Sequence, residues 1–494
     1  MNEIQSTDEK EYKTSCINVK KSEKKLMHYC DRQTSSAKLF KNAVTFRCRQ
    51  IICANYKDYE NLSNNELEVL AEFANVDMTF MFEKFWTLPN YYQFDAMFKA
   101  TNNPDYYNDL AMQSNQQIIK EVLESFKGYR KSMISYRKAP AKFTGKPKLP
   151  GYVKSDRTTV TITNQDAKIK DVYKKVKKQI GTTKNGKAKY KTEKVYLGKF
   201  LKLPKTDAMV PLGNLKIGKI KEVQIEPFYD TYRILIVEEL PKHDESKKVV
   251  LHPSRILGID LGVNNFVSTS NNCGLTPFVI NGNDIKAYNQ WYNKTIADLK
   301  SNLPIAQLSS KRIQSLNHKR YNVTNDFYNK VAHYVVKYCI DNDLGTIVIG
   351  KNTHWKLGTH MGVENNQNFC FLAHSVFITK LQNMAKKFGI NVIVAEESYT
   401  SKASFLDNDY VPTYGVDDDN AKFSGRRVHR GLYKTKDGIL MNADVNGASN
   451  AIRKAVPNAF DGITDFEYLY KTTLKVDLYK RDLDLQIKNR KTKM

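Results

Sequence analysis

The sequence has few cysteines, no long apolar run and no hydrophobic N-terminal segment. Its seven cysteines are scattered over 494 residues without the paired spacing of a disulfide framework, which indicates free thiols in a reducing compartment. No apolar run approaches the ~18 residues that a membrane-spanning helix needs. Residues 1–25 are polar and charged, so we expect no signal peptide. These absences predict a cytoplasmic protein without a membrane partner.

Acidic residues are also under-represented. The 52 Asp and Glu residues face 78 Lys and Arg residues, which gives a formal net charge of +26. A field of this size holds a protein on a polyanion, and nucleic acid is the most common one; in a bacterial cell this predicts association with the nucleoid. The alternative is a charged surface that serves solubility alone. The clustering of the charge favours nucleic acid.

Nearly half of the excess charge lies in one stretch of the chain. Between Gly151 and Lys205, 16 Lys and Arg residues stand against 4 Asp and Glu residues. A solvated hairpin tip accounts for some of these lysines. A surface that follows a phosphate backbone accounts better for their concentration.

A chain of 494 residues is too long for one hydrophobic core and predicts roughly three domains. Residues 1–25 contain few large apolar side chains and are expected to be flexible. Apolar residues recur at helical spacing from Ala37 to Ile52 and again between Leu62 and Arg137. Three prolines and two glycines between Ala139 and Tyr152 exclude helix and central strand there, so we expect an extended basic linker.

The second half of the sequence changes from short strands to alternating strands and helices. Residues 158–241 alternate apolar and polar side chains in short runs separated by turn residues, which predicts a small β-barrel or sandwich. From Leu251 onward, strand patterns alternate with helical ones, which predicts an α/β domain with parallel strands. The whole pattern is that of a multidomain α+β protein.

One aspartate stands out in the strand pattern. The run Arg255–Val267 predicts a strand, a tight turn and a second strand, with Asp260 at the end of the first. A carboxylate in a strand that is buried on both faces is costly unless it is paired or binds a metal ion. The alternative is an ordinary hairpin in which the aspartate caps the turn.

Further carboxylates occur in related positions. Glu396 and Glu397 directly follow the predicted strand 391–395. Asp444 lies in the first turn of a predicted helix whose N-cap is Asn442. The alternative for Asp444 is an acid that only complements the helix dipole.

The ends of parallel strands open into one crevice, where these carboxylates could converge. Three carboxylates within a few ångströms repel one another unless divalent cations lie among them. Mg²⁺ prefers carboxylate and water oxygens, and two such ions are a common arrangement for phosphodiester cleavage. The pattern therefore favours a site for two Mg²⁺ ions.

Three segments, Gly258–Asn265, Glu397–Ser404 and Asn442–Asn450, resemble the three motifs of the split RuvC nuclease domain. The chain is most similar to TnpB, the transposon-encoded RNA-guided DNA endonuclease that is related to Fanzor and ancestral to the type V CRISPR effectors. The resemblance covers most of the chain after about residue 26. It includes the basic linker and the basic helix around residues 311–320.

This resemblance implies a helical recognition lobe, a small β-barrel wedge domain and an RNase H-like α/β RuvC nuclease domain. It implies a guide RNA and target double-stranded DNA as partners, and leaves open whether the protein is a monomer or a homodimer. The expected ranges are a flexible N-terminus at 1–25, the start of the wedge domain at 26–57, the helical recognition domain at 58–138, the basic linker and barrel at 139–250, the nuclease domain at 251–455 with a degenerate zinc-finger region at 398–440, and a basic C-terminal tail at 456–494.

The sequence departs from the family at the central glutamate. Gly350 stands where most members carry that residue, whereas a subgroup carries it after the next strand, as Glu397 does. Strand alternation puts Glu397 on the face of Ile393 and Ala395. The resemblance thus implies Asp260, Glu397 and Asp444 as the catalytic residues and as ligands of two Mg²⁺ ions, with Glu396 as the alternative to Glu397.

A second departure concerns zinc and the basic residues. Residues 398–450 contain no cysteine, so no zinc site of the usual sulfur type is expected there. The arginines of this segment are better suited to phosphate. The residues expected to contact nucleic acid are Lys174, Lys175, Lys177, Lys178, Lys311, Arg312, Lys319, Arg320, Lys402, Arg426, Arg427 and Arg430.

The functional hypothesis is an RNA-guided DNA endonuclease that cleaves next to a short flanking motif. Three alternatives remain. A nuclease-inactive RNA-guided DNA-binding repressor is disfavoured because all three carboxylates are present. A transposase on an RNase H-like fold usually orders its acids Asp, Asp, Glu, whereas this chain has Asp, Glu, Asp. A compact type V CRISPR effector also fits the length of 494 residues.

Overall fold

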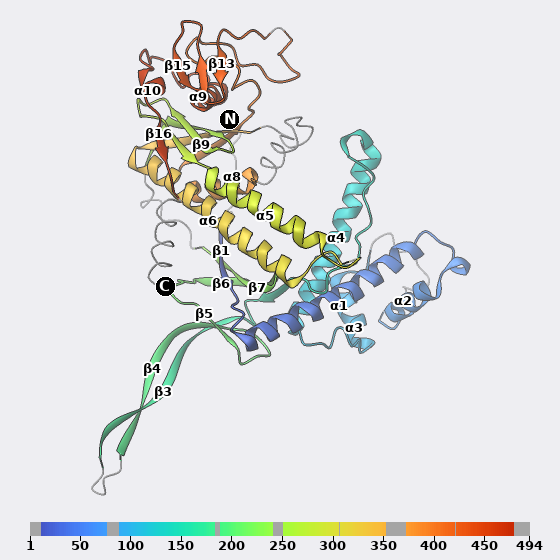
Figure 1. Ribbon diagram of the computed structural model, residues 1–494. Coiled ribbons are helices and arrows are strands. Elements are labelled where there is room, and N and C mark those ends of the chain that lie inside the picture. Colours follow the sequence, from blue (N-terminus) through green and yellow to red (C-terminus); the bar gives the residue numbers. More distant parts are fainter. Residues whose placement is uncertain are drawn as a thin grey trace. The chain divides into compact units, whose positions relative to one another are not determined.

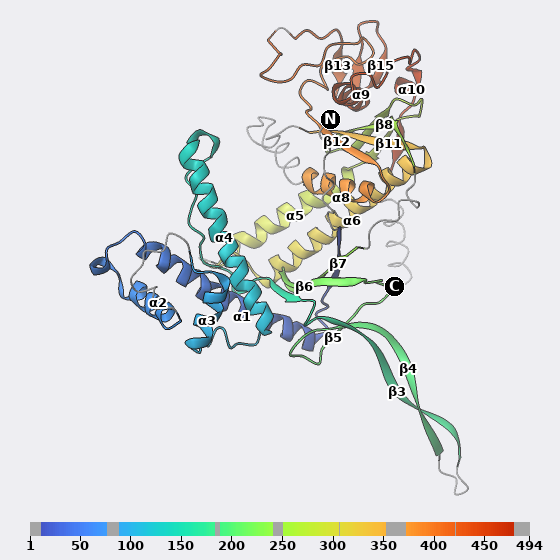
Figure 2. The ribbon, with the colours of Figure 1, turned by 180° about the vertical axis from the view of Figure 1, so that it is seen from behind.

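The computed structural model describes residues 11–76, 88–182, 188–240, 250–305, 307–351, 372–419 and 421–478. The chain divides into two compact units between His243 and Asp244. Figure 1 shows the elements coloured along the sequence from blue to red, and Figure 2 shows the same ribbon from behind. Each unit combines helices with β-sheet, so the expected multidomain fold of mixed α and β structure is confirmed.

In its described residues, the first unit begins with a strand and four α-helices and continues with six strands. Its elements are β1 (Tyr12–Asn18), α1 (Lys24–Ala54), η1 (Tyr59–Asn61), α2 (Asn64–Ala74), α3 (Tyr91–Ala100), α4 (Met112–Lys138), η3 (Pro140–Lys142), β2 (Val160–Thr163), β3 (Lys168–Thr182), β4 (Ala188–Lys202), β5 (Met209–Pro211), β6 (Lys219–Phe228) and β7 (Thr231–Glu239). The long helix α1 is the centre of this unit. Buried residues recur along it every three or four positions, and they share one core with α2, α3, α4 and the sheet.

The predicted β-barrel is not what the described residues form. Strands β1, β7, β6 and β2 make an open four-stranded antiparallel sheet, and β3, β4 and β5 make a separate three-stranded sheet. A barrel wall needs one apolar face turned inward. The lysines of β3 and β4 occupy both faces of their strands and cannot be buried without partners. Most of the length of β3 and β4 is therefore a solvent-exposed pair of strands, separate from the four-stranded sheet.

The N-terminal segment is more ordered than expected from its composition. Residues 12–18, predicted to be flexible, form β1 and pair in antiparallel register with β7 from Tyr12–Glu239 to Asn18–Arg233. The polar sequence is compatible with this role because β1 is an edge strand, with one face in solvent.

The second unit contains the remaining elements. They are β8 (His252–Leu261), β9 (Asn265–Asn271), β10 (Phe278–Asn281), α5 (Asn283–Ser301), α6 (Lys311–Asp341), β11 (Leu344–Gly350), α8 (His374–Lys386), β12 (Asn391–Ala395), β13 (Arg426–His429), β14 (Leu432–Lys434), β15 (Leu440–Asn442), α9 (Ala443–Ala455), α10 (Glu467–Tyr470) and β16 (Leu474–Val476). The central sheet has the order β12-β11-β8-β9-β10-β16. Strands β12, β11 and β8 are parallel, as predicted, while β9 runs antiparallel to both of its neighbours.

The two faces of the central sheet are covered by different helices. Leu257, Ile259 and Leu261 of β8 pack in one core with α6 and α8. Ile256 of β8 packs in a second core with α9. Because side chains alternate along a strand, Asp260 lies on the same face as Ile256, beneath α9.

Helix α9 leaves no space above the middle of β8. A Cβ atom at Gly258 would lie 2.6 Å from the carbonyl oxygen of Ala448 and 2.6 Å from Cγ1 of Ile452. Glycine is therefore required at this position for the helix to approach the sheet. The approach brings the first turn of α9 next to the end of β8.

No helix in the described parts of the chain is both long and apolar enough to cross a membrane. Six of the seven cysteines lie in described segments, and these six are free thiols. Cys370 lies outside the described residues.

Candidate active site

Asp260 is held at the end of β8 and is half-buried. Its backbone pairs with Ser268 of β9. Burial, followed by the negative charge of Asp444, raises the pKa of Asp260 to about 7. The Arg427 guanidinium, a hydrogen bond with Glu397 and the backbone N–H of Leu261 act in the opposite direction and are weaker.

Glu397 reaches Asp260 from the neighbouring part of the sheet. Strand β12 ends at Ala395, and Lys351 donates its N–H to the Ala395 carbonyl at 2.8 Å, which joins the ends of β11 and β12. Burial first, then the charge of Asp260 and the hydrogen bond to it, raise the pKa of Glu397 well above its ordinary value. A buried pair of this kind favours sharing one proton over two negative charges.

Two glycines make room for this pair. A Cβ atom at Gly350 would lie 3.1 Å from Cγ of Glu397, so Glu397 occupies the space next to the position where the family usually has its glutamate. A Cβ atom at Gly447 in α9 would lie 3.1 Å from Oδ2 of Asp260. Larger side chains at either position would press on the carboxyl groups.

Asp444 approaches from α9. Its backbone N–H donates to the side-chain oxygen of Asn442 at 2.9 Å, so Asn442 is the N-cap that the sequence predicts. The Asp444 carboxylate accepts hydrogen bonds from Nδ2 of Asn265 at 2.9 Å and from Nη2 of Arg427 at 3.4 Å. These partners are the first residue of β9 and a residue of β13, and they fix the orientation of the Asp444 carboxylate.

The three predicted carboxylates thus lie in one region, but with unequal closeness. Asp260 and Glu397 are in hydrogen-bonding contact, and Asp444 acts on Asp260 through its charge. All of them offer the hard oxygen ligands that divalent cations such as Mg²⁺ prefer. Among the described residues, no three His, Cys, Asp or Glu side chains are placed closely enough to hold a metal ion as they stand.

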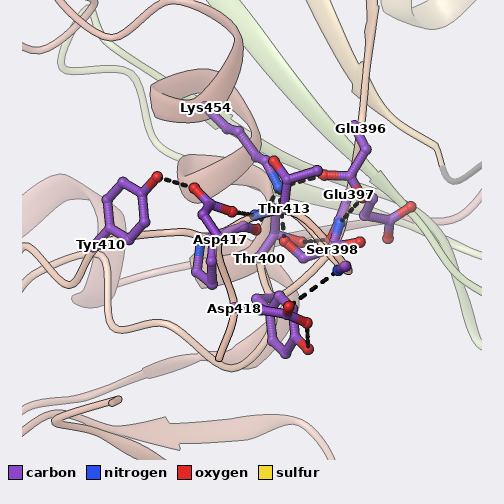
Figure 3. Close-up of polar contacts among 12 residues, drawn as sticks. Glu396, Glu397, Ser398, Thr400, Tyr410, Thr413, Asp417, Asp418 and Lys454 are labelled. Atoms are coloured by element: carbon purple, nitrogen blue, oxygen red, sulfur yellow. Dashed lines mark hydrogen bonds and ion pairs between the residues drawn. The ribbon is translucent and has the colours of Figure 1, made fainter. Parts of the chain in front are cut away.

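Glu396, the alternative to Glu397, faces a different environment. Its carboxylate accepts hydrogen bonds from Nζ of Lys454 and, at 2.7 Å, from the backbone N–H of Ser398. Burial opposes the charge of Glu396, but these hydrogen bonds outweigh it and hold the pKa of Glu396 below its ordinary value. Figure 3 shows its carboxylate turned toward Lys454, while that of Glu397 points elsewhere.

Lys454 connects several segments around the candidate site. Besides Glu396, its ammonium group donates to the backbone carbonyls of Ser398 at 3.1 Å and Pro412 at 2.7 Å. Only 12% of its side chain is exposed. Lys454 therefore fixes the loop that leads from β12 through Glu397, and nothing in the sequence pattern pointed to this lysine.

The predicted nucleic-acid contacts are placed on several surfaces. The exposed ones are Lys174, Lys175, Lys177, Lys178, Lys311, Arg312, Lys319, Lys402, Arg426, Arg427 and Arg430. Arg320 is half-buried. Arg320 donates to Oδ1 of Asn289 at 2.8 Å and lies over the Tyr292 ring, which ties it to α5. Arg427 contacts Asp444 and is the predicted basic residue placed at the carboxylates.

Two family models match the chain. A model described as a probable transposase, OrfB of IS605, matches residues 239–356, and a model of the Cas12f1-like TNB domain matches residues 374–451. The first range contains Asp260. The second contains Glu397 and Asp444.

Several solved structures are similar to the chain. The Cas12f1–sgRNA–target DNA complex has 15% sequence identity and a TM-score of 0.30 over 90% of this chain and 99% of that chain. A CRISPR-Cas12f ternary complex has 14% identity and a TM-score of 0.31, covering 85% and 81%. The mini-RNA-guided endonuclease CRISPR-Cas phi3 has 11% identity and a TM-score of 0.42, covering 90% and 92%. No curated protein matches the chain.

Proposed function

This chain carries the probable-transposase domain of the TnpB type and a Cas12f1-like TNB domain, and from that premise we propose that it is an RNA-guided DNA endonuclease. A bound guide RNA pairs with one strand of the target duplex, and the protein reads a short flanking motif. The RuvC-like site then hydrolyses phosphodiester bonds and leaves 5′-phosphate and 3′-hydroxyl ends.

The observation that carries this proposal is the hydrogen-bonding contact between Asp260 and Glu397, which are both half-buried. Two carboxyl groups, one in β8 and one just after β12, with Asp444 beside them, serve no packing purpose that apolar residues would not serve better. Asp260, Glu397 and Asp444 would hold two Mg²⁺ ions. When bound, such ions activate water and stabilise the leaving oxygen in phosphodiester hydrolysis.

The protein's own groups have separate tasks in this scheme. Asn265 orients the Asp444 carboxylate, and Lys454 holds the loop that carries Glu397. Arg427, which is exposed and lies beside Asp444, is suited to bind a phosphate of the strand to be cut. The basic residues of β3 and α6 hold the nucleic acid. The protein acts as a monomer or a homodimer in the cytoplasm, and in a bacterial cell it is associated with the nucleoid.

The alternatives make different use of the same site. A nuclease-inactive repressor would have no need for three carboxylates in one buried region, which favours the enzyme. A compact CRISPR effector would share the chemistry and differ in genomic context. A repeat array or a transposon end beside the gene would distinguish these two.

The test begins with purification at moderate salt, after which the co-purified RNA is sequenced. We expect one structured RNA, whose variable end directs cleavage of a matched DNA duplex. Asp260→Ala and Asp444→Ala are each expected to abolish cleavage while RNA-guided DNA binding is retained. Protein stripped of RNA that cuts a matched duplex equally well would falsify the guide hypothesis, and binding lost in step with cleavage would show that the carboxylates are structural.

A further inference from the structure

The β3–β4 ribbon is the longest pair of strands among the described residues of the first unit, and no second sheet packs against most of it. Strands β3 and β4 are 15 residues each. Beyond the short pairing of β5 with Phe200–Lys202, the described residues of the two strands pair only with each other. Figure 1 shows them as a long twisted pair. A two-stranded ribbon without a packed face is marginally stable in water, so a permanently bound ligand would suit it.

The pairing register divides the outer part of the ribbon into two faces. Paired residues share a face, and faces alternate along each strand. The tyrosine face consists of Tyr173, Lys175, Lys177, Gln179, Tyr190, Thr192, Lys194 and Tyr196. The opposite face consists of Lys174, Val176, Lys178, Lys191, Glu193 and Val195.

The tyrosine face combines exposed rings with positive charge. Tyr173, Tyr190 and Tyr196 are 56%, 57% and 51% exposed, so their rings are open to a ligand. Tyr173 and Tyr196 lie side by side with ring centroids 5.3 Å apart, and the Tyr196 hydroxyl donates to Asp171 at 2.9 Å, which fixes its ring. Three lysines lie between these rings and Tyr190, and no acidic residue does.

The composition of the ribbon identifies the kind of ligand. The two strands contain eleven lysines against one aspartate and one glutamate, which matches a polyanion. They contain no arginine, whose planar fork of donors suits bidentate contacts to guanine in the major groove of DNA. Aromatic rings that alternate with lysines suit a single strand instead: its bases stack on the rings, and its phosphates contact the lysines. Bases can stack on side chains in this way only where the strand is unpaired.

We infer that the tyrosine face of the β3–β4 ribbon binds an unpaired stretch of the guide RNA. This inference rests on the proposed function, because it takes its ligand from there. The guide RNA is the permanently bound polynucleotide of that scheme, whereas an unpaired DNA strand exists only after the target is opened. The bases stack on Tyr173, Tyr196 and Tyr190, and the phosphates contact Lys175, Lys177 and Lys194.

The two faces supply matched variants for a binding experiment. Full-length protein is stripped of RNA, and its affinity for an unpaired 20-nucleotide uridine RNA is measured at several salt concentrations. Tyr173→Ala with Tyr196→Ala is expected to weaken binding by about 5- to 150-fold for each base that loses its stack, with the salt dependence unchanged. Lys175→Ala with Lys177→Ala is expected to reduce the log–log salt slope by about 1.4, since each phosphate contact on a single strand contributes about 0.7.

The opposite face is the control. Lys174→Ala with Lys178→Ala removes the same charge from the same strand. The sequence predicted nucleic-acid contacts for these two lysines as well, but if the ligand lies on the tyrosine face they act only through their charge, and their loss should change the affinity and the salt slope less than the loss of Lys175 and Lys177. Equal losses from both lysine pairs, together with no loss from the tyrosine pair, would show that only total charge matters and would overturn the inference. Melting curves of all variants check that the fold is intact.

Crosslinking in the native RNA complex identifies the ligand. A photoreactive p-benzoylphenylalanine is placed at Thr192 on the tyrosine face or at Glu193 on the opposite face, and the complex is irradiated with labelled target DNA present. An RNA adduct from Thr192 and a much weaker one from Glu193 is the expected result. A DNA adduct from Thr192, or equal adducts from both positions, overturns the assignment. If the purified protein carries no RNA at all, the proposed function fails, and the uridine-RNA comparison still tests the face.

Discussion

The carboxylate site of the second unit and the β3–β4 ribbon of the first differ in how far their charged side chains are exposed to solvent. Asp260 and Glu397 are half-buried between the sheet and α9, and their pKa values are raised mainly by the loss of solvent around them. The ribbon exposes nearly every side chain of its outer part, charged and aromatic alike. Hydrolysis of a phosphodiester needs charges fixed in a place that is shielded from bulk solvent and admits the attacking water. Holding a flexible polyanion needs accessible charges on a surface. The two regions should therefore respond to mutation in opposite ways, one through reactivity and stability, the other through affinity alone.

The largest effect should come from the two consecutive glutamates. Glu397→Gln keeps the shape of the side chain but removes a carboxylate from the buried pair. We expect a cleavage loss well beyond the ~10–100-fold that loss of a supporting residue costs, measured as the single-turnover rate at saturating target. Glu396→Gln keeps an oxygen for the Ser398 N–H and should retain most activity. The reverse outcome would move the site to Glu396.

Gly350 offers a rescue that tests the same point. Because the Glu397 side chain fills the space beside Gly350, Gly350→Glu should recover partial cleavage when combined with Glu397→Ala and not when combined with Glu397→Gln. Recovery would be incomplete, since a misplacement of about 1 Å can cost ~10²-fold in rate.

Next in size is the lysine that holds the glutamate loop. Lys454→Met keeps the length of the side chain and removes its hydrogen bonds to Glu396, Ser398 and Pro412. We expect the cleavage rate to fall by ~10–100-fold with little change in target affinity, and Lys454→Arg to restore part of the rate. Lys471→Met, which removes an exposed ion pair with Glu467, is the control and should leave the rate unchanged. A fall in affinity instead of rate would assign Lys454 to nucleic-acid binding.

A third effect concerns the free energy of unfolding, which should respond differently to a glycine substitution in the packed region of α9 and β8 and to one on an exposed helix. Gly258→Ala forces a methyl group against α9 and should destabilise the protein by about 1–3 kcal/mol. Gly128→Ala in α4 meets no atom within 4 Å and should stabilise it by ~0.5–1 kcal/mol through higher helix propensity. Denaturant unfolding measures both. Equal changes would mean that the contact between α9 and β8 does not form in solution.

The raised pKa values predict a pH dependence that the ribbon should not show. Asp260 and Glu397 bind protons more tightly in the folded protein than in the unfolded chain. Without added metal, stability should therefore fall as the pH rises from about 4 toward 7, because the unfolded state loses these protons first. Thermal melting in EDTA between pH 5 and 8 measures this, and Asp260→Asn should flatten the curve. Added Mg²⁺ should raise the melting temperature more at pH 8 than at pH 5.5, because protons compete for the carboxylates at the lower pH.

The smallest effect completes the comparison. Tyr173→Ala with Tyr196→Ala should leave the melting temperature of the free protein unchanged, because both rings are more than half exposed and support no core. A clear drop would mean that the ribbon packs against another surface in solution and is not an open arm.

Much of the local structure and the proximity of Asp260, Glu397 and Asp444 could be predicted from the sequence. The strand that ends at Asp260, the N-cap Asn442 and the strand 391–395 depend on side-chain alternation and on hydrogen bonds within a few residues. The lysine excess of the ribbon was equally readable. The family matches at 239–356 and 374–451 confirm the relationship that the three motifs indicated. The catalytic and nucleic-acid roles of the individual residues remain predictions.

Tertiary structure decided the rest. The hydrogen bond between Asn265 and Asp444 joins residues 179 positions apart, and the bond between Lys454 and Glu396 spans 58. The pairing of β1 with β7 and the open sheet in place of a barrel are likewise set by contacts between distant segments. Alternation along a strand shows which residues share a face, but not which helix will cover that face. That helix is chosen by the summed packing of the whole unit, which no short stretch of sequence contains.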